Sequence, residues 1–182
     1  MLGCVTTSQT SSPQKPMAAA DPFKPYVPAT PAAAELTYVP PGRLLATTDA
    51  KPLTTIVSTG AVVCVWDPVS GAGGMAHFLL PESGNAPPAP RFGNVALGLL
   101  VEQVVKLGAV ERRLRARVYG GSAPPIATTG GHLGDHNIEK ALAFLKEHFV
   151  PVLENGSGGE SARKIVFNLK TGVAEVTRLG LN

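Results

Sequence analysis

The chain has 182 residues, of which 44% are hydrophobic and 16% charged, and its formal net charge is +3. This length and apolar content suit one globular domain with a tail, and so small a charge does not indicate nucleic-acid binding. Because no apolar run reaches about 18 residues, we expect no membrane insertion. The two cysteines, Cys4 and Cys64, do not make a disulfide framework, so we expect a reducing, cytoplasmic location.

The first 42 residues differ in composition from the rest. They contain eight of the 17 prolines, and alanine, serine and threonine fill much of the remainder. Such a segment buries too little apolar surface to offset the entropy lost on ordering. We therefore predict a disordered tail over residues 1–42 and a folded domain over residues 43–182.

The domain begins with segments typical of strands. Residues 54–57 and 61–66 are apolar and rich in β-branched side chains, and they are separated by residues 58–60. They predict one strand, or a bent pair of strands, buried on both faces. A glycine-rich turn at 70–74 then leads to residues 75–80, which we expect to return as an antiparallel partner strand because the connection is short.

Helical and extended segments alternate after a proline-rich loop at residues 82–90. Apolar residues at helical spacing between 97 and 105 predict an amphipathic helix that ends at Gly108. Arginines alternate with apolar residues over 113–118, which predicts a strand with a solvated basic face.

The last part of the chain predicts a second helix and a hairpin. The helix is expected to begin near Asp135, and residues 164–169 and 173–178 are expected to form the closing hairpin around the turn at 170–172. The predicted fold class is therefore α+β, a single domain with mixed and antiparallel sheets layered with two main helices.

Two motifs in the first half carry a family resemblance. The segments Gly60-Ala-Val-Val-Cys-Val-Trp-Asp-Pro68 and Gly73-Gly-Met-Ala-His-Phe-Leu-Leu-Pro81 resemble the core signature of the CheD family, the chemoreceptor glutamine deamidases of bacterial chemotaxis. Further segments resemble the family in the same order, namely Arg91-Phe-Gly93, Val118-Tyr-Gly-Gly-Ser122, Leu133-Gly-Asp-His-Asn137 and Gly158-Gly-Glu-Ser-Ala-Arg163.

The resemblance implies a CheD-like cysteine-hydrolase fold and a catalytic site. In the family, a cysteine thiolate attacks the side-chain amide of a receptor glutamine, a histidine pairs with the cysteine, and a threonine orients the histidine. By position in the motif, His77 is the histidine and Thr54 the threonine, with Thr55 as a rival. The nucleophile position is occupied by Gly60, which has no side chain.

Cys64 is a poor substitute for the missing nucleophile. It lies four residues after Gly60, on the same side of the predicted strand, but about 13 Å farther along it at roughly 3.3 Å per residue. Activation of a thiol needs a base within hydrogen-bond reach, and burial among valines makes a thiol less reactive. Cys64 is therefore predicted to be a core residue, and Ser58 and Thr59 are much weaker nucleophiles.

We expect neither a metal nor another cofactor. His132 and His136 are four residues apart, but no third ligand has the spacing that completes a zinc site. The glycine-rich turn at 70–74 lacks the lysine and the following helix of a phosphate-binding loop.

Two functions remain open. Gly60 favours a CheD-like chemotaxis adaptation protein that binds the cytoplasmic domains of methyl-accepting chemoreceptors, and a CheC-like phosphatase, without catalysis. The alternative is an active chemoreceptor glutamine deamidase that converts receptor glutamine side chains to glutamate. Both partners are implied by the resemblance.

Overall fold

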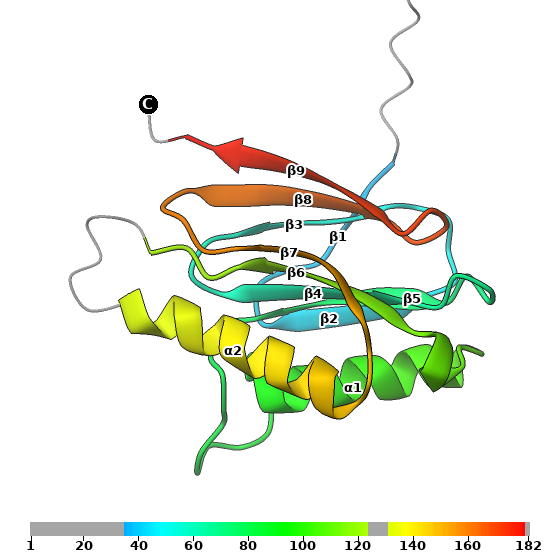
Figure 1. Cartoon of the computed structure of the whole chain (residues 1–182), viewed down its shortest axis with the longest axis horizontal. Helices are drawn as coiled ribbons and strands as arrows, with labels where there is room; N and C mark the ends of the chain where they lie inside the picture. The colour runs from blue at the N-terminus through cyan, green and yellow to red at the C-terminus, as the bar shows by residue number, and fades with distance from the viewer. Residues whose placement is uncertain (1–34, 124–130, 181–182) are drawn as a thin grey trace, which may run out of the picture. The chain divides into compact units, whose positions relative to one another are not determined.

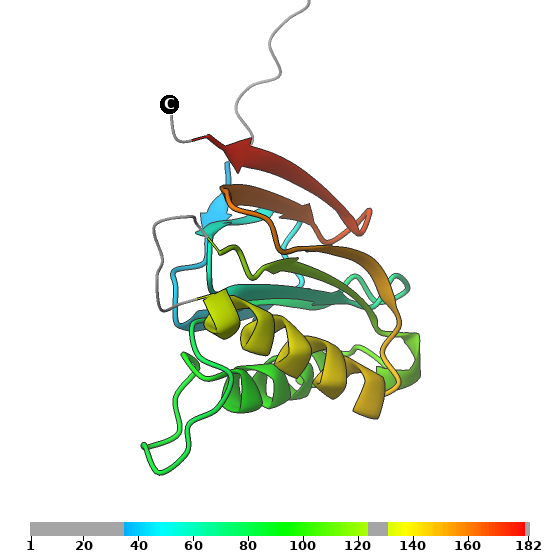
Figure 2. The same cartoon turned by 60° about the vertical axis from the view of Figure 1, so that its left-hand side comes forward.

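The computed structural model describes residues 35–123 and 131–180, and these form three layers. A four-stranded sheet packs on a five-stranded sheet, and both helices cover the opposite face of the five-stranded sheet (Figure 1). Figure 2 shows the two helices side by side beneath that sheet. This arrangement confirms the predicted α+β class with two main helices.

The four-stranded sheet has the order β1-β3-β8-β9. Only β1 and β3 are parallel, and the other neighbours are antiparallel. The strands are β1 (Thr37–Tyr38), β3 (Leu53–Val57), β8 (Ala162–Asn168) and β9 (Val173–Leu179). The predicted closing hairpin, β8 and β9, is confirmed.

The five-stranded sheet has the order β2-β5-β4-β6-β7 and contains one parallel pair, β6 and β7. Helix α2 connects these two strands, as a parallel pair requires a crossover. The strands are β2 (Arg43–Thr47), β4 (Ala61–Trp66), β5 (Gly73–Phe78), β6 (Arg115–Gly120) and β7 (Val152–Ser157). The helices are α1 (Gly93–Lys106), the 3₁₀ turn η1 (Glu111–Arg113) and α2 (Gly131–Glu147).

Strand β4 is buried along its whole length because it lies in the central layer. Val62, Cys64 and Trp66 pack into the core between the sheets, whereas Val63 and Val65 pack into the core between the sheet and the helices. The prediction of a segment buried on both faces is confirmed, as is its antiparallel pairing with β5. The two predicted strand segments belong to different sheets, and residues 58–60 carry the chain from β3 to β4.

The structure departs from the sequence predictions at several points. Thr37 and Tyr38 pair with β3 and Val39 is buried, so the first described strand lies before the boundary predicted after residue 42. Residues 1–34 lie outside the described part. Helix α2 begins at Gly131, four residues before the predicted Asp135. Strands β2 and β7 were not predicted, because neither has a clear alternation of apolar and polar residues.

The expected solvated arginine face is corrected as well. Asp67 is fully buried and accepts hydrogen bonds from Arg113 at 2.6 Å and from the Val110 amide at 3.0 Å. These contacts, the guanidinium foremost, hold the pKa of Asp67 well below its usual range. Arg117 pairs with Glu154 and donates a hydrogen bond to the Gly172 carbonyl. Arg113 and Arg117 therefore each connect separate segments of the fold.

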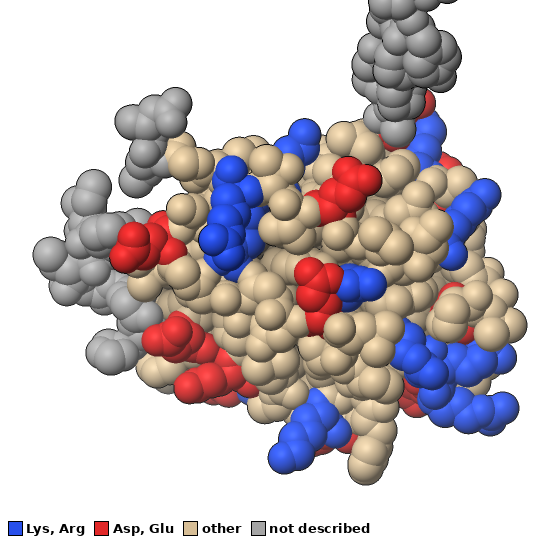
Figure 3. Space-filling view, turned by 45° about the horizontal axis from the view of Figure 1, so that its top comes forward, with Lys and Arg blue, Asp and Glu red and all other residues tan. Residues whose placement is uncertain are grey.

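No helix of the described residues is long and apolar enough to cross a membrane. On the face that includes the β8–β9 side, basic and acidic side chains are interspersed among uncharged ones (Figure 3).

Candidate functional site

The bend at residues 58–60 brings Gly60 beside His77. Gly60 immediately precedes β4, and the antiparallel register of β4 and β5 pairs Val62 with His77 and Ala61 with Phe78. A Cβ atom added to Gly60 would lie 3.3 Å from Nε2 of His77. The residue predicted to occupy the nucleophile position is thus next to the predicted catalytic histidine.

The His77 ring is buried and held in one orientation. Its side chain lies between the two sheets, is 2% exposed, and its Nδ1 lies 2.9 Å from the Thr55 hydroxyl. Nε2 is the nitrogen nearest Gly60. Because burial disfavours the charged form, it lowers the pKa of His77 to about 4. The imidazole is therefore neutral near pH 7.

Thr54 does not make the predicted contact with His77. Its hydroxyl donates to the Ile165 carbonyl at 2.8 Å. Neighbouring side chains of a strand point to opposite faces, so Thr54 and Thr55 cannot both face the space between the sheets. The threonine that contacts His77 is Thr55, the rival position, and its side chain is fully buried.

Asn137 is a site residue that sequence reasoning did not single out. It lies on α2, is fully buried, and its Nδ2 donates to the carbonyls of Thr59 at 3.1 Å and Leu79 at 3.0 Å. It therefore ties the residue before Gly60 to the end of β5. In the sequence, Asn137 could be noticed only as the last residue of the segment 133–137, which resembles the family.

The end of β6 forms a wall of the site. The Gly121 amide donates to the Gly60 carbonyl at 2.8 Å. Gly120 has a φ of +110°, and a Cβ there would collide with the same carbonyl oxygen. Glycine is therefore required at this position for the close approach of β6 to Gly60.

Cys64 is separated from this site by the register of the sheet. It pairs with Met75 on one side and Arg117 on the other, whereas His77 lies opposite Val62. The thiol is fully buried between the sheets, and burial raises its pKa far above the ordinary value. The prediction that Cys64 is a core residue is confirmed.

Two exposed leucines follow the site at the end of β5. Leu79 is 40% exposed, and its Cδ2 lies 3.5 Å from the place that a Cβ on residue 60 would take, so Leu79 packs beside that place. Leu80 is 38% exposed. We call Leu79 and Leu80 the leucine pair.

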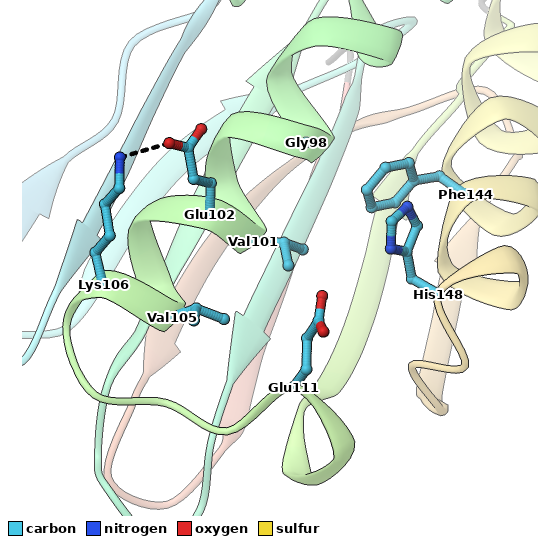
Figure 4. Close-up of a pocket in the computed structure, with 8 residues that line it drawn as sticks. All are labelled: Gly98, Val101, Glu102, Val105, Lys106, Glu111, Phe144 and His148. Atoms are coloured by element: carbon cyan, nitrogen blue, oxygen red, sulfur yellow. Dashed lines mark hydrogen bonds and ion pairs between the residues drawn. The ribbon is translucent and has the colours of Figure 1, made fainter.

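A hollow of about 440 Å³ lies between α1 and α2 (Figure 4). Its wall includes Val101, Val105 and the Phe144 ring, which stacks on His148 with 4.1 Å between ring centroids. None of the predicted site residues lines it. Because His77 lies in the core between the two sheets, this hollow is on the other side of the five-stranded sheet.

The described residues contain no group of three or more histidine, cysteine, aspartate or glutamate side chains that could hold a metal ion. The side chain of His132, considered above as a ligand, lies outside the described part.

Comparison with known proteins gives a consistent result. A family profile described as CheD chemotactic sensory transduction matches residues 79–178. The "Probable chemoreceptor glutamine deamidase CheD 1" of Anaeromyxobacter dehalogenans is 38% identical over 143 residues, which cover 78% of this chain and 84% of that protein. The corresponding protein of Trichlorobacter lovleyi is 38% identical over 129 residues, covering 69% and 80%. That of Agrobacterium fabrum is 42% identical over 117 residues, covering 63% and 64%.

Proposed function

The chain belongs to the CheD family of chemotaxis proteins, and from this premise we propose that it binds chemoreceptors without deamidating them. The similar proteins are named chemoreceptor glutamine deamidases. The observation that carries the proposal is Gly60, because the atom that would bear a nucleophile opposite His77 is absent.

Loss of the nucleophile removes the covalent route. A covalent intermediate divides one difficult hydrolysis into two easier steps, and it requires a nucleophile within hydrogen-bond reach of its base. Cys64 cannot take over, because it is buried and pairs with Met75 rather than lying beside His77. Deamidation would therefore need another nucleophile within reach of Nε2.

The parts that shape the site are nevertheless present. His77 keeps its contact with Thr55, and Asn137 still joins the two chain segments that flank the site. The leucine pair adds exposed apolar surface at the same place. A shaped, partly apolar surface without a nucleophile supports recognition of a partner, since exposed apolar groups in a cluster mark interaction sites.

We assign this recognition to the cytoplasmic domains of chemoreceptors, and accordingly place the protein in the cytoplasm. A CheC-like phosphatase is proposed as a second partner on the same face, as the family resemblance implies. The competing function, an active deamidase, is distinguished by its product, a receptor glutamate.

The experiment that tests receptor binding is a comparison of Leu79→Glu with Leu153→Glu. Both leucines are exposed, Leu79 by 40% and Leu153 by 55%. Leu153 lies on β7, the edge strand of the five-stranded sheet, which is separated from β5 by β4 and β6. We expect Leu79→Glu to weaken binding of a receptor cytoplasmic fragment at least tenfold in isothermal titration calorimetry, and Leu153→Glu to leave it unchanged. A wild-type protein that binds no receptor fragment, or equal losses in the two variants, would overturn the proposal.

A further inference from the structure

A small polar pocket lies where the β7–β8 turn meets β9. Its volume is about 120 Å³, and it is lined by two arginines, Arg163 and Arg178, together with the turn residues Ser157, Gly158, Gly159, Glu160 and Ser161. The family resemblance described above assigns no role to this pocket.

Arg163 lines this pocket as a buried cation. It is 5% exposed, and its guanidinium donates to the carbonyls of Gly120, Gly156 and Gly158. None of the ion pairs among the described residues includes Arg163. A guanidinium has five N–H donors, so these three contacts leave two donors without a partner among the described residues. Carbonyl oxygens satisfy hydrogen bonds but leave the positive charge uncompensated, and an uncompensated buried charge is costly.

Arg178 adds a second positive charge at the same place. It is the direct cross-strand neighbour of Arg163 in the antiparallel pair β8–β9, and like charges in that arrangement are destabilising. Burial in the first place, and Arg178 in the second, lower the pKa of Arg163. Glu160 lines the pocket, but the described residues contain no ion pair between it and either arginine.

We propose that Arg163 and Arg178 form an oxyanion-binding pocket that takes a carboxylate or phosphate group. Guanidinium groups bind these planar or tetrahedral oxyanions through charge-assisted hydrogen bonds. The pocket, of about 120 Å³, has room for a small oxyanion such as phosphate or a side-chain carboxylate.

The pocket shares a chain segment with the Gly60 site. Arg163 donates to the Gly120 carbonyl, the Gly121 amide donates to the Gly60 carbonyl, and the Ala123 amide donates to the Gly159 carbonyl. An anion held by Arg163 would therefore fix the wall of the site. Its source is either a free anion or an acidic side chain of a bound receptor, and the second source rests on the proposed function.

The first experiment titrates the protein with inorganic phosphate at constant ionic strength. We expect saturable shifts of the backbone amide resonances of residues 158–163 and a rise in the unfolding midpoint. Arg178→Gln should weaken both effects at least tenfold. The matched control is Arg112→Gln, which removes the same charge from an exposed position on η1 outside the pocket. Absence of a saturable response in the wild type, or an equal loss in the two variants, would overturn the proposal.

Glu160 supplies a further control, because its own carboxylate could fill the pocket. Glu160→Gln should strengthen phosphate binding modestly by removing a negative neighbour. If a phosphate response is seen in Glu160→Gln but not in the wild type, Glu160 itself is the occupant and the proposed external ligand is wrong.

A second experiment identifies the source of the anion. If a receptor carboxylate is the ligand, Arg178→Gln weakens binding of the receptor fragment and phosphate competes with it. If a free anion is the ligand, receptor binding is unchanged while the phosphate response is lost. Failure of the wild type to bind any receptor fragment contradicts the proposed function but leaves the phosphate result, and so the pocket, standing.

Discussion

Placing a thiol at position 60 tests whether the nucleophile is the one part that the site lacks. Gly60 is not among the described glycines with positive φ, so its backbone conformation does not by itself require glycine. In Gly60→Cys, the new Cβ would lie 3.3 Å from Nε2 of His77, which brings the sulfur within contact of the base. Burial alone disfavours the charged imidazole, but a thiolate beside the ring would stabilise it. We therefore expect the thiol and the ring to form a thiolate–imidazolium ion pair in this variant.

The substitution also has a steric cost. The same Cβ would lie 2.7 Å from the Phe78 carbonyl oxygen, a backbone atom that must shift to make room. Overpacking of this kind costs about 1–3 kcal/mol. In a domain of this size each kcal/mol lowers the unfolding midpoint by about 2–4 °C, and Gly60→Ala should show the same loss because it carries the same Cβ.

The assay is the rate of alkylation by iodoacetamide as a function of pH. A thiol has an ordinary pKa of about 8.5, and each unit by which His77 lowers that pKa gives about tenfold more thiolate at low pH. We expect Gly60→Cys to be alkylated at pH 6 at least tenfold faster than the double variant with His77→Asn. The wild type, which contains Cys4 and the buried Cys64, provides the background. An ordinary thiol pH profile that is insensitive to His77→Asn would refute the reasoning and show that the site has changed beyond residue 60.

Two further predictions concern His77. Thr55→Val should lower the alkylation rate of the Gly60→Cys variant, because Thr55 orients the His77 ring. Thr54→Val removes only the hydrogen bond to the Ile165 carbonyl and should leave the rate unchanged. Equal effects of the two substitutions would contradict the assignment of Thr55. The unfolded chain takes up the histidine proton below its ordinary pKa of about 6.5, while the folded protein resists protonation down to about 4. The free energy of unfolding should therefore fall as the pH decreases from 6.5 to 4, by on the order of 3 kcal/mol. Urea denaturation should show that this dependence is lost in His77→Gln, and an unchanged dependence would rule out His77 as its source.

The sequence predicted most elements of the fold because their patterns are local. The hydrophobic period revealed both helices, and the β-branched runs revealed β3, β4 and the closing hairpin. Strands β2 and β7 were not predicted because their burial depends on neighbours distant in the chain. Strand β2 pairs with β5, and β7 pairs with β6 across the α2 crossover. The assignment of β3 and β4 to different sheets is likewise a tertiary property, set by the bend at residues 58–60.

Position in the motif predicted that Gly60 and His77 lie side by side, as the structure shows. It selected Thr54 as the partner of the histidine, whereas His77 contacts Thr55. The catalytic roles of these residues stay predictions. A shift of one residue reverses the face of a strand side chain, so only the register of β3 decides between these threonines. The pairing of Arg113 with buried Asp67 could not be anticipated either, because the two residues lie 46 positions apart.

The most direct test of the central claim is the mass of receptor glutamines after incubation with the wild-type protein. A receptor cytoplasmic fragment is mixed with the protein under conditions in which calorimetry shows that they bind, and its peptides are then analysed by mass spectrometry. Deamidation converts an amide to an acid and adds about one dalton, so a bound but unmodified fragment is the result that we predict from the absence of a nucleophile at Gly60. A one-dalton gain at specific glutamines, abolished by His77→Ala, would contradict the claim and show that the protein is an active deamidase.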